Sequence, residues 1–416
     1  MREREKRKLK SEKGVVGLTA LALACAISAF AGNPCEKWNM DALSKVPRTR
    51  PVETMSTDGV KALMIEGPKW RGRETWAFAY YAAPEWANPS NRAPGIVLVH
   101  GGLGTAYKRW VKLWKDRGYA AIAVDNCGGW PVRGEGADWL RHKWSGPEGW
   151  GGYTTLDEPV EDQWFYHAVS VSILSHTLLR SFPEVDTRAI GLTGISWGGI
   201  LTCVIAGVDH RFAYAVPVYG CGFLYEHGFA GKQDDAARAK WGTIWDPSLY
   251  LPFARCPFLW VDGTNDFAFA LDGVRQSAAL VADSAFTTIV RMVHAHGAPG
   301  EDPGEILAFA DRYARGGKDI VRITSAKTER GILTAAFDPN GRKVVKAELV
   351  WTADAKGDWK GWDRWYYETQ DVPGFNPESR TVAVTVPPSA RLWYVSLVTD
   401  DGLRFSTPLF GTPLMR

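Results

Sequence analysis

The sequence predicts an α/β fold, a mostly parallel sheet with helices on both faces, followed by an all-β sandwich. The first observation is a series of strands of unbroken hydrophobicity, such as residues 95–100 and 120–124, that alternate with helix-length segments. Such strands are typical of parallel sheets, because those sheets are buried on both faces. The second observation is that the hydrophobic period changes to two from residue 319 onward. A chain of 416 residues, 45% of them hydrophobic, is long enough for both cores.

The N-terminal segment predicts a signal peptide over residues 1–31. Residues 1–13 carry seven Lys or Arg against three Glu, and the apolar run that follows closes on Ala29-Phe30-Ala31. A basic region, an apolar region and a small-residue cleavage site in this order are typical of secretory signals. The most apolar part is shorter than the roughly 20 residues that cross a bilayer, which favours cleavage over a membrane anchor. We therefore expect a secreted or periplasmic protein with no stable membrane span after cleavage.

Cleavage of this leader changes the charge and the cysteine count. The whole chain has a formal net charge of +3, and residues 1–31 contribute 7 − 3 = +4, which leaves 3 − 4 = −1. No nucleic-acid partner is expected from that balance. The five cysteines that remain have neither the spacing of a disulfide framework nor a zinc-ligand spacing with His, so we predict no metal.

Two domains are predicted after the leader. Residues 32–318 form the α/β domain, and residues 319–416 form a sandwich of the immunoglobulin or fibronectin type III kind. In the first domain, a hairpin at 60–66 and 74–82 precedes strands at 95–100, 120–124, 189–194, 212–218, 257–261 and 286–293, with helices at 110–118, 163–180, 272–281 and 306–314. In the second domain, strands are predicted at 321–325, 331–337, 344–351, 363–368, 381–386, 392–398 and 405–409.

Two insertions interrupt the α/β domain, at residues 126–158 and 220–255. Both follow the carboxyl ends of strands, where open parallel sheets bind their ligands. Tryptophans are frequent in them, at positions 130, 139, 144, 150, 241 and 245. These side chains either line a substrate pocket, where their faces would stack on sugar rings, or pack the long loops.

The pentapeptide G-I-S-W-G at 194–198 predicts a nucleophile elbow. A short apolar strand ends here and an apolar helix-length segment follows, which is the strand, sharp turn and helix of the G-x-S-x-G motif. The serine of such a turn has a strained backbone, and strand and helix nearly touch. Gly194 and Gly198, two residues on either side of Ser196, therefore occupy positions without room for a side chain.

Partners for Ser196 follow in the order of an α/β-hydrolase, which is nucleophile, acid and histidine. Asp266 follows strand 257–261 and is the predicted acid; Asp262 lies too close to the strand end. The last strand runs into His294 and His296, and we prefer His294 as the base because the strand leads straight into it, with His296 as the alternative. The backbone N–H groups of Gly102 and Trp197 are the predicted oxyanion hole.

The chain resembles secreted bacterial α/β-hydrolases of the dienelactone-hydrolase and acetylxylan-esterase-like group. The resemblance is carried by G-I-S-W-G-G at 194–199, W-V-D-G-T-N-D-F at 260–267, R-M-V-H-A-H at 291–296, P-G-E-I at 303–306 and the β-rich tail. It covers most of residues 50–416. It implies an esterase, often one that acts on decorated polysaccharides, with Ser196 as nucleophile, Asp266 as acid and the histidine pair as base.

These residues predict hydrolysis of a small-molecule or polysaccharide ester through an acyl-enzyme, with no cofactor. One alternative is a prolyl-oligopeptidase-like serine peptidase, but the roughly 60 mature residues before His100 cannot form the gating propeller that such enzymes usually carry. The other is a carbohydrate-binding protein with a vestigial site, which would have no need of Ser, Asp and His at these strand ends. We expect the C-terminal strands to orient or bind rather than catalyse.

Overall fold

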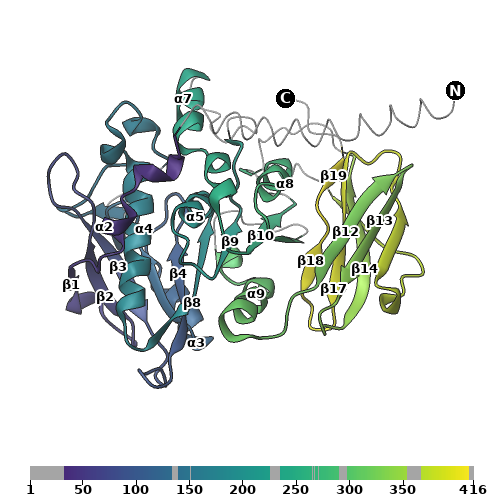
Figure 1. Ribbon diagram of the computed structural model, residues 1–416, viewed down its shortest axis with the longest axis horizontal. Helices are drawn as coiled ribbons and strands as arrows, with labels where there is room; N and C mark the ends of the chain where they lie inside the picture. The colour runs from purple at the N-terminus through teal and green to yellow at the C-terminus, as the bar shows by residue number, and fades with distance from the viewer. Residues whose placement is uncertain are drawn as a thin grey trace. The chain divides into compact units, whose positions relative to one another are not determined.

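The structure is a computed structural model that describes residues 32–133, 139–149, 151–224, 235–264, 266, 268–269, 271–289, 298–353 and 367–411 (Figure 1). Contacts divide the chain into two compact units, residues 1–39 and 40–416. The predicted signal peptide lies outside the described residues. In the first unit, the 3₁₀ helix η1 (Pro34–Lys37) begins after Asn33, whose side chain accepts a hydrogen bond from the Cys35 N–H.

A large mixed sheet runs through the second unit. Its central strands, from β5 through β4, β8, β9 and β10 to β11, pair in parallel, and β1, β2 and β3 extend it in antiparallel pairs. This confirms the predicted α/β fold. In sheet order the strands are β1 (Thr49–Pro51), β2 (Lys61–Glu66), β3 (Trp76–Ala82), β5 (Ala120–Val124), β4 (Ala93–Val99), β8 (Val185–Ile195), β9 (Tyr214–Val218), β10 (Phe258–Gly263), β11 (Ser284–Ile289), β18 (Arg404–Ser406), β17 (Leu392–Thr399), β14 (Val344–Thr352) and β15 (Glu368–Asp371).

Helices cover both faces of this sheet. The long helix α4 and the helix α5 pack against each other and on one face, while α3 and α9 lie on the other (Figure 1). The central strands β4, β5 and β8 are buried through most of their length, since both faces are covered. The α-helices described in the second unit are α2 (Met40–Leu43), α3 (Lys108–Asp116), α4 (Trp164–Ser181), α5 (Trp197–Val208), α7 (Asp235–Trp245), α8 (Leu271–Ala278) and α9 (Gly304–Arg315).

Short elements occupy the connections and the two insertions. The first insertion contains a two-stranded hairpin, and the second contains α7. These elements are η2 (Glu53–Met55), β6 (Gly129–Arg133), β7 (Trp139–Arg141), η3 (Tyr153–Thr155), η4 (Val160–Asp162), η5 (Pro247–Leu249), η6 (Leu251–Phe253), η7 (Ala298–Glu301) and η8 (Pro377–Ser379).

The C-terminal region is β-rich, as predicted, and the large sheet continues into it. Strand β11 pairs antiparallel with β18 through Phe286 and Ser406. Strands β12 (Arg322–Glu329), β13 (Ile332–Asp338) and β16 (Thr381–Thr385) form a separate three-stranded sheet, and β19 (Phe410–Gly411) pairs with β17. The predicted strand 363–368 falls largely outside the described residues. The division into domains at 318/319 stays a prediction.

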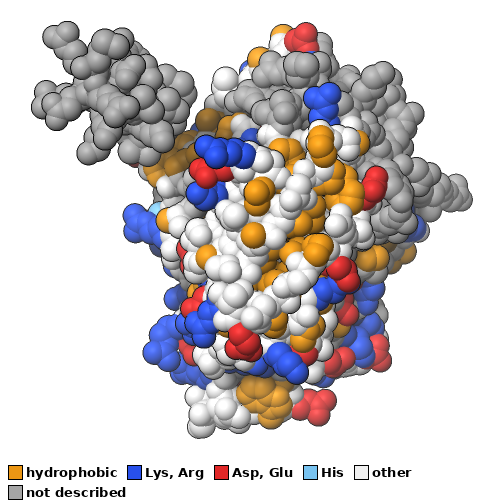
Figure 2. Space-filling model, turned by 90° about the vertical axis from the view of Figure 1, so that its right-hand side faces the viewer, with side chains coloured by type: hydrophobic (Ala, Val, Ile, Leu, Met, Phe, Trp, Pro, Cys, Tyr) orange, Lys and Arg blue, Asp and Glu red, His pale blue; other side chains and the backbone are white. Residues whose placement is uncertain are grey.

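Two features of this C-terminal region concern its core and its surface. Val350, Tyr367, Leu392, Tyr394 and Leu409 form a buried cluster, against which Leu271 of α8 packs. Figure 2 faces the C-terminal strands and shows a band of hydrophobic side chains among polar ones. Ile332 and Val345 are exposed large hydrophobic residues of these strands.

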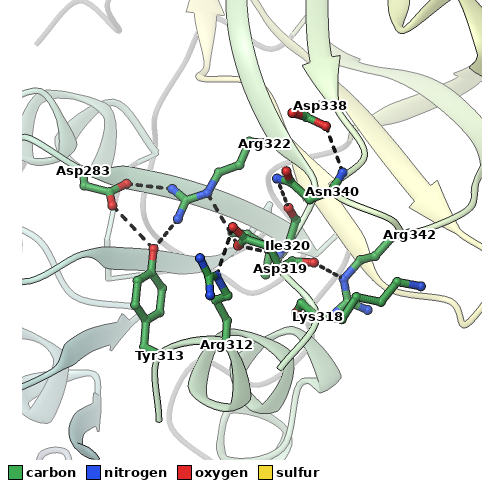
Figure 3. A network of polar contacts seen from close by, with 10 residues as sticks. All are labelled: Asp283, Arg312, Tyr313, Lys318, Asp319, Ile320, Arg322, Asp338, Asn340 and Arg342. Atoms are coloured by element: carbon green, nitrogen blue, oxygen red, sulfur yellow. Dashed lines mark hydrogen bonds and ion pairs between the residues drawn. The ribbon is translucent and has the colours of Figure 1, made fainter. Parts of the chain in front are cut away.

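A polar network joins α9, β12 and the turn between β13 and β14 (Figure 3). The Arg322 guanidinium on β12 donates to Asp283 Oδ1 at 2.6 Å and also contacts the Tyr313 hydroxyl of α9. Asp319 pairs with Arg312 of α9 at 3.1 Å, and its carbonyl accepts from Arg342 Nε at 2.7 Å. The connection between α9 and the C-terminal strands is therefore held from both sides.

Candidate active site

Ser196 lies at the turn between β8 and α5, next to the carboxyl ends of the parallel strands. Its backbone has φ 58° and ψ −119°, a conformation that a serine rarely adopts, and its side chain is buried. The Ser196 N–H donates to the Val218 carbonyl at the end of β9, at 2.9 Å. The neighbouring strand thus fixes the strained turn, as in a nucleophile elbow.

Steric contacts explain why the pentapeptide has glycine at positions 194 and 198. A Cβ atom on Gly194 would lie 2.2 Å from the Gly198 carbonyl oxygen, and one on Gly198 would lie 2.0 Å from the Val99 carbonyl oxygen of β4. Both contacts are with backbone, which cannot swing away. The local geometry therefore requires glycine at both positions, for the reason that the sequence indicates.

The turn after β4, residues 100–104, packs directly on Ser196. A Cβ atom on Gly101 would lie 2.7 Å from the Ile195 carbonyl oxygen and 3.0 Å from Ser196 Cβ. The Gly104 N–H donates to the Gly101 carbonyl at 3.1 Å. Gly102, the predicted oxyanion donor, lies in the middle of this turn.

His100 holds the turn from inside the protein. Its Nε2 accepts a hydrogen bond from the Asn126 N–H at 3.0 Å, so the ring proton is on Nδ1, which lies 2.8 Å from the Gly101 carbonyl oxygen and donates to it. Burial lowers the pKa of His100 more than nearby Asp125 raises it. His100 is thus a neutral structural donor. Sequence reasoning missed this role, although a histidine between a buried strand and a glycine turn was the available signal.

Trp197, the first residue of α5, belongs to a buried aromatic cluster. Its ring lies 6.2 Å from that of Trp164 and 6.1 Å from that of Trp241 on α7. Its backbone N–H lies at the helix N-terminus, where the amides of the first turn point out of the helix end. Trp241 and Trp245 are 1% and 0% exposed, so they pack their insertion and line no open pocket. Trp150 lies outside the described residues.

Asp266 follows β10 and is buried. Its Oδ1 accepts hydrogen bonds from the Ala268 and Phe269 N–H groups at 2.7 and 2.9 Å. Burial raises its pKa to about 7, although these two hydrogen bonds oppose the shift. Among the described residues its Oδ2 has no hydrogen-bond partner. Asp266 Oδ2 could therefore accept a hydrogen bond from a group such as a histidine ring.

Asp262, which the sequence places too close to the strand end to be the acid, has a different environment. It is the penultimate residue of β10, and burial, with the charge of Asp266 adding to it, raises its pKa well above the ordinary value. Asp262 lines a cavity of about 20 Å³ shared with Tyr394 and Thr407 of the C-terminal region, which is room for about one water molecule. Asp262 therefore faces this cavity, whereas Asp266 lies beyond the end of β10.

His294 and His296 lie outside the described residues. Each histidine that the structure does describe contacts another group through a ring nitrogen. The buried pair of His176 and Asp209, joined at 2.8 Å, lies beyond the far end of α5 from Ser196, about 18 Å along the helix. Among the other described histidines, His100 contacts Gly101 and Asn126, His142 contacts Ser145, His167 contacts Glu161 and His210 contacts Gly207.

The described part of the chain offers neither a cluster of metal ligands nor a helix that could span a membrane. It contains no group of three or more His, Cys, Asp or Glu residues that could hold a metal ion. None of its helices is both long and apolar enough to cross a membrane. No disulfide bond joins its five cysteines, at positions 35, 127, 203, 221 and 256.

Comparison with known proteins gives a family match and a fold. Residues 61–236 match the family model described as acetyl xylan esterase (AXE1). No curated protein sequence matches the chain. The acetyl xylan esterase from Paenibacillus sp. R4 is similar in structure, with a TM-score of 0.54 and 18% identity over 68% of this chain and 95% of that one. Acetyl xylan esterase 1 from Thermoanaerobacterium sp. JW/SL YS485 has a TM-score of 0.47 and 17% identity over 64% and 90% of the two chains.

The family match contains Ser196, Gly102 and Trp197 and ends before Asp266 and His294. The roles of these five residues therefore stay predictions. The match agrees with the resemblance found in the sequence, and the Paenibacillus structure shows the same fold. The chain thus has the α/β-hydrolase fold, and its match to the acetyl xylan esterase family model over residues 61–236 supports a serine hydrolase of carboxylic esters.

Proposed function

We propose that the protein hydrolyses esters of acylated carbohydrates through an acyl-enzyme formed on Ser196. The observation that carries this proposal is the strained, buried Ser196 between β8 and α5, in contact with the glycine turn after β4. An acylated sugar is favoured because the family that matches residues 61–236 is named for acetyl xylan.

The proposed roles follow serine hydrolase chemistry. The histidine takes the Ser196 proton, the alkoxide attacks the ester carbonyl, and the histidine returns the proton to the leaving alcohol. Water activated by the same histidine then releases the acid. Asp266 orients the histidine, and the N–H groups of Gly102 and Trp197 hold the oxyanion. No cofactor is required.

The replacement Ser196→Ala tests the nucleophile. We expect kcat for p-nitrophenyl acetate to fall by about 10⁴-fold or more, since the attacking group is lost. Covalent labelling by a fluorophosphonate, followed by mass spectrometry, should disappear with it, while circular dichroism stays unchanged. Near-normal turnover in this variant would refute the proposal. A panel of acetylated, feruloylated and methyl-ester carbohydrates, with a peptide as comparison, then identifies the substrate class.

The base is assigned to His294 on the ground that it directly follows the last predicted strand. Each described histidine already contacts another group through a ring nitrogen, which supports a base among the histidines outside the described residues. We expect His294→Ala to abolish turnover and His296→Ala to have a mild effect, because only one ring can be both oriented by Asp266 and close to Ser196. The opposite pattern of kcat values would give the role to His296.

We also infer that the protein is exported. The support is the basic and apolar leader that ends at Ala31. N-terminal sequencing of the protein from a periplasmic or culture fraction should begin after Ala31. Recovery of the uncleaved chain in the cytoplasmic fraction alone would contradict export.

A further inference from the structure

The hairpin of the first insertion contacts the turn beside Ser196 through one tryptophan. Strands β6 and β7 pair antiparallel, and Trp139 is the first residue of β7. Its indole Nε1–H donates to the Leu103 carbonyl oxygen at 2.9 Å, a good distance for such a bond. Residues from two separate loops thus meet at the turn after β4.

This bond is the outer end of a short hydrogen-bonded chain. The Leu103 carbonyl and the Gly104 N–H belong to one planar peptide group, and the Gly104 N–H donates to the Gly101 carbonyl at 3.1 Å. The Gly101 carbonyl and the Gly102 N–H belong to the next such group. Two rigid planes and two hydrogen bonds therefore connect the Trp139 indole with the Gly102 N–H. Bonds in such a chain also polarise one another.

The outer side of the turn is exposed and its backbone is strained at Leu103, so its geometry depends on these hydrogen bonds. Leu103 has φ 58°, a left-handed conformation that leucine rarely adopts, and its side chain is 64% exposed. His100 supports the Gly101 carbonyl from inside at 2.8 Å. Trp139 supplies the corresponding support from outside.

The hairpin is itself anchored, so it can hold the indole in place. The Arg133 guanidinium lies over the Trp139 ring, 4.3 Å from its centroid. At the base of the hairpin, the Gly129 N–H donates to Asp125 Oδ1 at 2.8 Å, and Arg141 donates to the Gly146 carbonyl at 2.8 Å. A Cβ atom on Gly129 would lie 3.1 Å from Trp139 Cβ, so the two strands are close at this point.

We propose that Trp139 is a positioning residue for ester hydrolysis, which fixes the direction of the Gly102 N–H through the peptide groups of the turn. The inference rests on the proposed role of Gly102 as an oxyanion donor. Such a donor contributes more in the transition state than in the ground state. Loss of the indole hydrogen bond should therefore lower kcat and leave KM nearly unchanged.

The test compares Trp139→Phe with Trp393→Phe. Both variants keep an aromatic ring and lose an indole hydrogen bond of 2.9 Å, since Trp393 donates to Thr328 Oγ1 between β17 and β12, away from Ser196. For p-nitrophenyl acetate we expect Trp139→Phe to lower kcat roughly tenfold, below the 10²- to 10³-fold lost when an oxyanion donor is itself removed. KM should stay within about twofold, and Trp393→Phe should match the wild type.

A transition-state analogue gives the readout that a purely structural role would not move. A trifluoromethyl ketone forms a tetrahedral adduct with the serine, so its affinity should fall with kcat in Trp139→Phe. Unchanged kcat and inhibitor affinity, with only a lower melting temperature, would overturn the proposal, as would a loss confined to KM. If Trp139→Phe does not fold, benzothienylalanine at 139 keeps the shape without the N–H and answers the same question. Ser196→Ala separates the two hypotheses: activity there refutes the nucleophile, whereas an inactive Ser196→Ala beside a fully active Trp139→Phe refutes only the positioning role.

Discussion

The nucleophile side and the acid side of the site are built in different ways. Ser196 is held by backbone, with its N–H bonded to β9 and the glycines around it pressed against β4 and α5. On the acid side, Asp262 and Asp266 are buried carboxyls, and three of their four oxygens have no hydrogen-bond partner among the described residues. The nucleophile is thus positioned by close packing of the backbone, whereas the acid side consists of buried carboxyl groups, of which Asp266 is held by two backbone N–H groups. The two sides should therefore respond to different substitutions.

Apart from the loss of Ser196 itself, the largest effect is expected from the acid. Asp266→Asn should lower kcat by about 10³- to 10⁴-fold, because an amide presents the wrong hydrogen-bonding group to the histidine. Asp262→Asn is the matched control: Asp262 is the other buried carboxyl, in β10, and has no proposed catalytic role, so kcat should stay within about threefold. Steady-state kinetics measure kcat for both variants, and an unfolding curve shows that each variant is folded. If Asp262→Asn were inactive and Asp266→Asn active, Asp262 and not Asp266 would be the acid of the site.

The next effect concerns the shape of the nucleophile side. Gly198→Ala should destabilise the protein by about 3 kcal/mol or more, since its methyl group would meet the fixed Val99 carbonyl. Gly304→Ala is the control at the start of α9, where the methyl group would meet only the end of the Leu403 side chain. Its stability should stay within about 1 kcal/mol of the wild type, helped by the helix propensity of alanine. Urea unfolding measures both, and equal stabilities would show that the elbow tolerates a wider turn.

The most gradual effect, spread over several pH units, is a pH dependence on the acid side. Because burial raises the pKa of Asp266 from 3.8 to about 7, the folded protein binds more protons than the unfolded chain between these values. Stability from this group is therefore highest at low pH and falls as pH rises through that window, by up to about 1.4 kcal/mol per unit. Buried His142 and His167, whose pKa values are lowered to about 4, act in the opposite direction, since the unfolded chain binds their protons more readily.

The difference between the wild type and Asp266→Asn isolates the aspartate from these histidines. Unfolding free energies at pH 4.5, 5.5 and 6.5 should show the wild type losing stability relative to the variant as pH rises. A flat difference would mean that a cation compensates the Asp266 charge in the folded protein.

What the sequence predicts well is what local periodicity controls. The predicted strand 120–124 coincides with β5, and the pentapeptide around Ser196 has the expected strand, turn and helix. Contacts between distant segments carry no such signal. Trp139 and Leu103 are 36 residues apart, and nothing in their spacing indicates that an indole bonds to that carbonyl. The antiparallel pairing of β11 with β18 was likewise beyond reach, because a short strand does not specify its partner.

That pairing has a consequence for the order in which the chain can fold. The Thr287 hydroxyl of β11 donates to the Arg404 carbonyl of β18, a residue 117 positions later. As the chain emerges during synthesis, β11 can pair with β10 at once, but its other edge remains open until β18 arrives. An open strand edge is a template for pairing with a second molecule, and late contacts of this kind slow folding. Newly made protein therefore depends on its last strands to protect the sheet from aggregation.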